Sequence, residues 1–232
     1  MTHATAPPTS HPEPLVRSRL YKLLSLGFRY PDAEGFETLQ SGEYLNAVWE
    51  CVTAVPHLER LATEKPQIEQ TIRNSLNGVS LLDLEVGFNQ TFEVGAPEPP
   101  CPPYEGVYRQ EETRTSLMVE IAEFYKHFGL HVSQEEGKRD LPDHLCAELE
   151  FLHFLTFKEA QARHEENTEL LDGYLLAQKD FLERHLAKWL PTYSEKMRSS
   201  STVPFYTQLA RIAAGYVANE LEWVQTTCPP PS

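Results

Sequence analysis

Residues 141–155 read LPDHLCAELEFLHFL, and their apolar positions repeat with the period of an α-helix. Leu145, Leu149 and Leu152 lie three or four residues apart, so they line one face of a helix. Similar stripes occur at Val16–Leu24, Tyr44–Val52, Leu81–Phe92, Leu117–Phe128, Leu171–Trp189 and Tyr206–Val224. No stretch shows sustained apolar–polar alternation with β-branched enrichment, so strands are not required. The sequence predicts an all-α domain of about seven to nine helices.

The ends of the chain differ in composition from its middle. Residues 1–13 and 228–232 are rich in Pro and small polar residues, so we predict a disordered N-terminal tail and a flexible C-terminus. One helical domain is expected over residues 14–227. A polar stretch with two Gly at about 129–141 could be a hinge between two helical halves.

The charge balance excludes some classes of partner. The chain of 232 residues has 20 Lys and Arg against 34 Asp and Glu, a net charge of −14. This sign disfavours nucleic-acid binding, which needs a basic surface. The N-terminus lacks the basic and apolar regions of a signal peptide, and no apolar run approaches the length of a membrane span. The four Cys include no CxxC, so we expect a cytoplasmic protein with free thiols.

A Pro-rich segment interrupts the helical pattern. Residues 93–109 read EVGAPEPPCPPYEGVYR, and five of residues 97–103 are Pro, which removes backbone donors and favours extended geometry. The segment could be a rigid connector. Alternatively, the segment could bind a peptide. The Pro residues are followed by Tyr104, Tyr108 and Arg109, which are residue types common in peptide-binding surfaces. The residues alone leave both interpretations open.

The start of the helix at 141–155 also has two interpretations. Asp140 suits the N-cap, Pro142 the first turn, and the Asp143 carboxylate faces the positive end of the helix dipole. His144 and Glu148 are four residues apart and would share a helix face. These groups either cap the helix and form a surface ion pair, or make a polar recognition site.

A metal site is a further alternative. Glu150 and His153 match half of a di-iron carboxylate pattern, which would require a second such pair on another helix. We find no convincing second pair. Hydrolase and P-loop motifs are also absent.

Several segments together resemble the TorD/DmsD/NarJ family, the chaperones for maturation of molybdenum redox enzymes. They cover residues 15–224 in the family's order and are YKLLSLGFRYP (21–31), GFNQTF (87–92), APEPPCPPYEGVYR (96–109), FYKHFGL (124–130), LPDHLCAELEFLHFL (141–155), FLERHLAKWLP (181–191) and FYTQLA (205–210). Gly87, Thr91, Cys101 and Gly106 depart from the family's usual residues. The form of the Pro-rich loop resembles the subgroup that serves periplasmic dehydrogenases and chlorate- or selenate-type reductases.

The resemblance implies a non-enzymatic function. Such a chaperone binds the catalytic subunit of a DMSO-reductase-family molybdoenzyme through its twin-arginine signal peptide and holds it in the cytoplasm for molybdenum cofactor insertion before export. No cofactor would be bound stably, because molybdopterin guanine dinucleotide belongs to the client. A general adaptor that binds a folded partner without reading a signal peptide is the other possibility within the family. The protein would be a monomer or a helix-exchanged homodimer.

Carried onto matching positions, the implied peptide-binding surface comprises Phe88, Phe92, Pro100, Pro103, Tyr104, Glu105, Tyr108, Arg109, Asp143, His144 and Glu148. Carboxylates would contact the arginines of the peptide, and aromatic and Pro faces its apolar part. Residues 83–112 hold seven acids and one base, and residues 129–172 hold eleven acids and four bases. We therefore expect a local acidic surface at these two segments.

Overall fold

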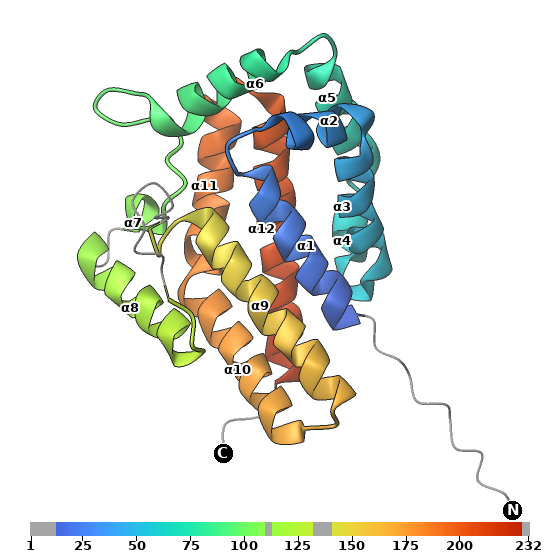
Figure 1. Cartoon of the computed structure of the whole chain (residues 1–232), viewed down its shortest axis with the longest axis vertical. Helices are drawn as coiled ribbons and strands as arrows, with labels where there is room; N and C mark the ends of the chain where they lie inside the picture. Colours follow the sequence, from blue (N-terminus) through green and yellow to red (C-terminus); the bar gives the residue numbers. More distant parts are fainter. Residues whose placement is uncertain (1–12, 110–112, 132–140, 229–232) are drawn as a thin grey trace, which may run out of the picture.

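The computed structural model describes residues 13–109, 113–131 and 141–228, and the regular elements within these ranges are all helices (Figure 1). The elements are α1 (Glu13–Gly27), α2 (Ala33–Ser41), α3 (Glu43–Ala54), η1 (Pro56–Leu58), α4 (Glu59–Ala62), α5 (Lys65–Leu76), α6 (Leu81–Phe88), η2 (Asn89–Glu93), α7 (Glu105–Tyr108), α8 (Arg114–His127), α9 (Leu145–His164), α10 (Thr168–Arg184), α11 (Leu186–Ser200) and α12 (Pro204–Thr227). The all-α prediction is confirmed. The twelve described α-helices exceed the expected seven to nine for two reasons. The short helices α2, α4 and α7 contain none of the predicted stripes, and the single stripe at Leu171–Trp189 is divided between α10 and α11.

The long helices form a bundle around α1 and α12. Helix α9 packs against α1 and α10, while α12 packs against α10, α11 and α5. Helices α3 to α5 flank one side of this bundle, and α7 and α8 lie on the opposite side (Figure 1). Helix α6 lies across one end of the bundle, beside the start of α12.

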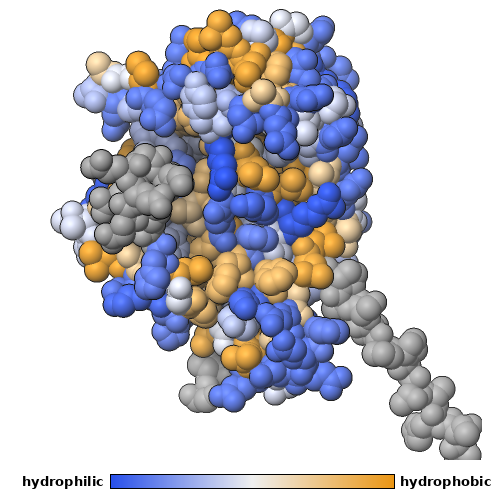
Figure 2. All heavy atoms as spheres, viewed as in Figure 1, coloured by the Kyte–Doolittle hydropathy of each residue, from blue (hydrophilic) through white to orange (hydrophobic). Residues whose placement is uncertain are grey.

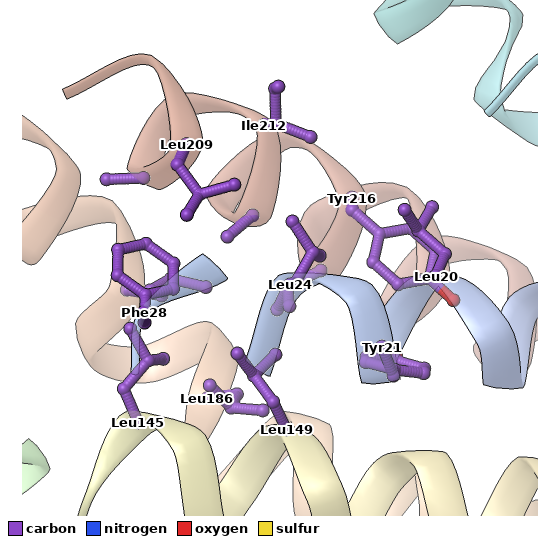
Figure 3. Packing of buried hydrophobic residues seen from close by; sticks show 14 of the residues in the cluster. Leu20, Tyr21, Leu24, Phe28, Leu145, Leu149, Leu186, Leu209, Ile212 and Tyr216 are labelled. Atoms are coloured by element: carbon purple, nitrogen blue, oxygen red, sulfur yellow. The ribbon is translucent and has the colours of Figure 1, made fainter. Parts of the chain in front are cut away.

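The core is the apolar face shared by α1, α9 and α12. Figure 3 shows side chains of α1 pointing between the other helices, and all the labelled residues are buried: Leu20, Tyr21, Leu24, Phe28, Leu145, Leu149, Leu186, Leu209, Ile212 and Tyr216. Burying one such side chain stabilises the fold by about 1.5–3 kcal/mol. The stripes that predicted the helices are thus the surfaces that hold them together.

Capping residues and Pro determine where several of the helices begin. Pro66 lies in the first turn of α5, a position at which its missing N–H is not needed for an intrahelical hydrogen bond. Ser80 and Asp83 form a capping box at α6. The start of α9 differs from the prediction: the helix begins at Leu145, and His144 is its N-cap. The Nδ1 atom of His144 accepts the Cys146 amide at 3.1 Å, so Asp143 precedes the helix instead of lying in its first turn.

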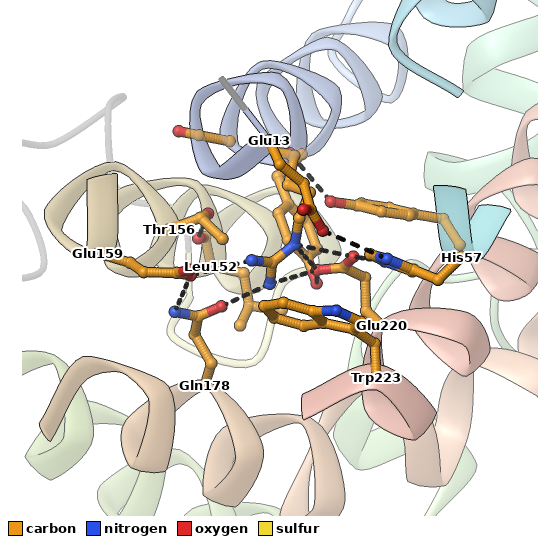
Figure 4. A network of polar contacts seen from close by, with 12 residues as sticks. Glu13, His57, Leu152, Thr156, Glu159, Gln178, Glu220 and Trp223 are labelled. Atoms are coloured by element: carbon orange, nitrogen blue, oxygen red, sulfur yellow. Dashed lines mark hydrogen bonds and ion pairs between the residues drawn. The ribbon is translucent and has the colours of Figure 1, made fainter. Parts of the chain in front are cut away.

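A fully buried polar network ties four helices together (Figure 4). Arg17 of α1 donates to Glu220 of α12 at 2.9 Å, to Glu159 of α9 at 2.9 Å and to Gln178 of α10 at 2.8 Å. Burial by itself would lower the pKa of Arg17, but the charges of Glu220 and Glu159 outweigh it and raise the pKa. His57 also bonds to Glu220, at 2.6 Å. The network therefore contains charged groups that are matched inside the fold.

The predicted boundaries fall mostly at the edges of the described residues. Helix α1 begins at Glu13, one residue before the expected domain start, and Cys228 caps the end of α12. The remainder of both predicted tails, and most of the predicted hinge, lie outside the described residues. No helix in the described ranges has the length and apolar character that crossing a membrane would require.

Candidate functional site

The two segments singled out by the sequence meet in space. Tyr104, at the end of the Pro-rich loop, forms an antiparallel bridge with His144, at the start of α9. The Glu105 amide donates to the Asp143 carbonyl oxygen at 2.9 Å, and the Leu145 amide donates to the Pro103 carbonyl oxygen at 2.9 Å. We call the segments 103–109 and 143–148 together the joint.

The Glu105 carboxylate is buried inside the joint. Its Oε1 atom accepts from Arg109 at 2.8 Å, and its Oε2 atom lies 3.1 Å from Nδ1 of His185. Arg109 also donates to the Arg184 carbonyl oxygen at 2.7 Å. This carboxylate thus joins α7 to the junction of α10 and α11.

Asp143 is also buried, and it organises the residues around the bridge. Its Oδ2 atom accepts from Nε of Arg114 at 2.9 Å and from the Gly106 amide at 3.3 Å. The guanidinium of Arg114 lies over the ring of Tyr104, 4.7 Å from its centroid. The ring of Tyr104 in turn meets that of His144 edge to face at 5.1 Å.

Glu148 is the third buried acid of the joint. Trp189 donates its Nε1–H to Glu148 at 3.2 Å. Burial, and next the nearby charge of Glu105, hold the pKa of Glu148 well above its ordinary value, although the bond from Trp189 opposes this. Glu148 therefore holds its proton to a higher pH than an ordinary Glu.

Three acids of the two segments do not contribute to the expected acidic surface, whereas others, such as Glu93, Glu98 and Glu169, are exposed. Glu105, Asp143 and Glu148 have no exposed area. Arg109 and His185 contact Glu105, Arg114 pairs with Asp143, and Trp189 donates to Glu148, whose Oε1 atom has no hydrogen-bond partner among the described residues. The predicted alignment of His144 with Glu148 on one helix face is wrong, because His144 precedes the helix. No observation tests peptide binding at the joint, so that role stays a prediction.

The other residues of the implied surface are partly accessible or belong to the core. Tyr104, Tyr108, Arg109, His144 and Pro100 are half-buried, and Pro103 is buried. Tyr108 stacks on Trp189 with ring centroids 5.5 Å apart. The joint therefore presents the edges of its half-buried aromatic side chains, with its carboxylates behind them.

Phe88 and Phe92 lie on α6 and η2, in an aromatic cluster separate from the joint. Their rings are 4.8 Å apart, and both contact Tyr206 of α12. Both are nearly buried, while the half-exposed Tyr30 covers Phe88 at 5.3 Å. Phe28 extends the cluster toward the interior.

Two glycines that depart from the family pattern have local packing reasons. A Cβ atom on Gly87 would lie 2.6 Å from the Val203 side chain, and one on Gly106 would lie 2.5 Å from Cγ of Arg114. Larger residues at these positions would displace their neighbours. Cys101 is buried, and burial raises the pKa of its thiol to about 11.

The structure also contains a groove that the sequence did not reveal. It has a volume of about 520 Å³ and lies where the end of α1, α2, the start of α3, α6 and the start of α12 meet. Apolar side chains form much of its lining: Leu23, Leu26, Phe36, Leu39, Tyr44, Leu84, Phe205 and Tyr206. Three acids, Asp32, Glu34 and Glu43, stand at its edge. Residues 30–50 hold five acids and no Lys or Arg, a signal that could have indicated this site.

The metal-site alternative has no support among the described residues. Glu150 bonds to Lys22 and Ser25, both at 3.1 Å, and pairs with Arg29. His153 bonds through Nδ1 to Ser18 at 2.8 Å. No group of three or more potential ligands is found in the described part of the chain, and none of the four cysteines forms a disulfide there.

Comparison with known proteins identifies the family. A family model described as nitrate reductase delta subunit matches residues 58–195. The chain belongs to this family. It is 35% identical over 211 residues to the perchlorate reductase assembly chaperone protein of Dechloromonas aromatica, covering 90% of this chain and 89% of that protein. It is 28% identical to the dimethyl sulfide dehydrogenase assembly chaperone protein of Rhodovulum sulfidophilum, over 91% of this chain and 83% of that protein.

A solved structure supports the fold independently. A protein from Archaeoglobus fulgidus, assigned as a redox enzyme maturation protein, superposes with a TM-score of 0.50 at 21% identity, covering 94% of this chain and 98% of that one. The resemblance to the TorD/DmsD/NarJ family is confirmed, because relatives named chaperone protein TorD also match. The expected non-enzymatic character is confirmed as well, since these relatives are named for enzyme assembly.

Proposed function

We propose that this protein is a cytoplasmic chaperone for the catalytic subunit of a DMSO-reductase-family molybdoenzyme. It binds that subunit through its twin-arginine leader, holds it for insertion of the molybdenum cofactor and then releases it for export. The observation that carries the proposal is the similarity to an assembly chaperone over nine-tenths of the chain. The cofactor, molybdopterin guanine dinucleotide, belongs to the client, and the chaperone itself holds none.

The chemistry of the molecule supports such a client. A leader of this class combines arginines with an apolar stretch, and a net charge of −14 favours its encounter with the chaperone. The groove beside α2, with its apolar lining, offers apolar surface for the second part of the leader.

Calorimetric titration of the full chain with a synthetic twin-arginine leader peptide tests the proposal. We expect binding that weakens when both arginines are replaced by Gln, and that weakens again as salt is raised, because exposed charges are screened. The same peptide with its apolar stretch replaced by Ser is the matched control for the apolar contribution. Equal affinity for the twin-Arg and twin-Gln peptides at every salt concentration would contradict recognition of the arginines.

The adaptor alternative gives a different result in a parallel titration. A chaperone that recognises the leader should bind the catalytic subunit without its leader much more weakly than the complete subunit. Equal affinity for both forms would favour an adaptor that recognises the mature body.

A further inference from the structure

We propose that the groove between α1, α2, α3, α6 and α12, and not the joint, is where a client segment with large apolar side chains and flanking Arg or Lys residues docks. This inference rests on the proposed function, since the occupant comes from the client protein. It adds a location and a division of roles: apolar side chains enter the groove, and basic side chains meet the acids at its edge.

The first argument is the apolar lining of the groove. Leu26 and Tyr30 remain 44% and 52% exposed there, although the side chains behind them are core residues. Figure 2 shows apolar atoms gathered near α1 and α2 and bordered by hydrophilic side chains. A volume of about 520 Å³ lies within the range of pockets that bury most of a ligand. Covering this lining would remove apolar surface from water, which drives association.

The second argument is the charge of the edge. Asp32, Glu34 and Glu43 are exposed, and no described cation forms an ion pair with them. The single cation in the lining, Arg29, already pairs with Glu150. The edge therefore has an excess of negative charge, and a basic residue of the occupant complements it.

The third argument is the contrast with the joint. Glu105 and Asp143 are already paired with Arg109 and Arg114 inside the fold. An incoming arginine would have to displace these partners and open buried structure, whereas Glu34 and Glu43 are reached from solvent at once.

The groove also adjoins residues that the family resemblance marks for peptide binding. The ring of Tyr30, in the lining, contacts Phe88 at 5.3 Å, and Tyr206 contacts both Phe88 and Phe92. The two phenylalanines thus stand behind the lining and shape it, even though they are nearly buried.

The test measures binding of the synthetic twin-arginine leader peptide to full-length variants. Glu34→Lys/Glu43→Lys reverses the edge charge, and we expect roughly tenfold weaker binding because two attractions become repulsions. Glu50→Lys/Glu123→Lys makes the same change of net charge at exposed positions outside the groove, with side chains 69% and 65% exposed. This matched control should change affinity much less.

Two further variants separate the groove from the joint. Leu26→Ser removes an exposed apolar side chain of the groove and should weaken binding several-fold. His144→Asn keeps a good N-cap on α9 but removes the ring that meets Tyr104, and it should weaken binding much less than Leu26→Ser.

The outcomes distinguish the two proposals. Loss of affinity in His144→Asn, with both groove variants binding normally, would overturn the groove and leave the chaperone function standing. Equal weakening by the edge variant and its charge-matched control would also overturn the groove, because it would show a general charge effect. Absence of any binding to the wild-type chain would contradict leader recognition itself, and the groove proposal with it.

Discussion

At the scale of residues, the joint shows how one carboxyl group can be kept neutral. Glu105 and Glu148 are buried close together, and Glu105 is the one that Arg109 and His185 compensate. The Glu148 carboxyl accepts the indole N–H of Trp189 at Oε2, and its Oε1 atom has no hydrogen-bond partner among the described residues. Burial and the charge of Glu105 raise its pKa, so the folded protein retains a proton there that the unfolded chain would release.

This proton makes stability depend on pH in a defined direction. Above the ordinary Glu pKa of 4.5, the folded state binds more protons at Glu148 than the unfolded state. Stability from this site therefore falls as pH rises from about 4.5 through the raised pKa. Glu148→Gln imitates the neutral acid and escapes this cost, so its stability relative to wild type should increase from pH 5 to pH 8.

Urea unfolding of both proteins at the two pH values measures the difference. The groups that face the site, Glu105, Asp143, Tyr125 and His185, remain in both proteins. Glu123→Gln, at an exposed acid on α8, serves as the control and should show no such trend. A Glu148→Gln variant that loses stability relative to wild type as pH rises would show that Glu148 is ionised in the folded state.

At the scale of elements, the long helices could be predicted and their polar connections could not. The stripes of α1, α9 and α12 follow the helical period because those faces are buried together. Helices α4 and α7 have one turn each, too short for any period to appear. Arg17, Glu159 and Glu220 look like ordinary surface charges in the sequence, because their partners are brought together only by the bundle.

Contacts that only the folded bundle creates also explain which features of the candidate site could not be predicted from the sequence. The Pro-rich loop and the start of α9 were recognised from composition and motif, and the structure brings them together. The burial of Glu105 and Asp143 could not be foreseen, because it depends on Arg109, Arg114 and His185. The groove was missed since its lining comes from five separate helices, none of which has a distinctive motif.

The buried network predicts a strong contrast between two arginines of α1. Arg17→Met should destabilise the protein by about 3–5 kcal/mol, because it removes the buried cation that Glu159 and Glu220 share. Glu159 would keep only Arg163, and Glu220 only His57, as an ion-pair partner. Arg19→Met should cost less than about 1 kcal/mol, because its side chain is 57% exposed and its ion pair with Glu50 is long, at 3.7 Å. Denaturant unfolding of the two variants gives the comparison. Similar losses in both would contradict a structural role for the network.

At the scale of the whole molecule, the fold is a helical bundle with two surfaces of different construction. The joint closes the Pro-rich loop onto α9 with internally paired charges, while the groove leaves apolar and acidic side chains exposed. The family relation and the excess of negative charge concern the entire chain and point to a protein client. The central claim is that this client is a molybdoenzyme catalytic subunit bound before its cofactor is inserted.

The most direct measurement is calorimetric titration of the full chain with a DMSO-reductase-family catalytic subunit, prepared with its twin-arginine leader in cofactor-free and cofactor-loaded forms. We expect one-to-one binding of the cofactor-free form and clearly weaker binding of the loaded form, because the proposed function includes release of the client after cofactor insertion. Absence of binding to the cofactor-free subunit, or equal affinity for both forms, would contradict it.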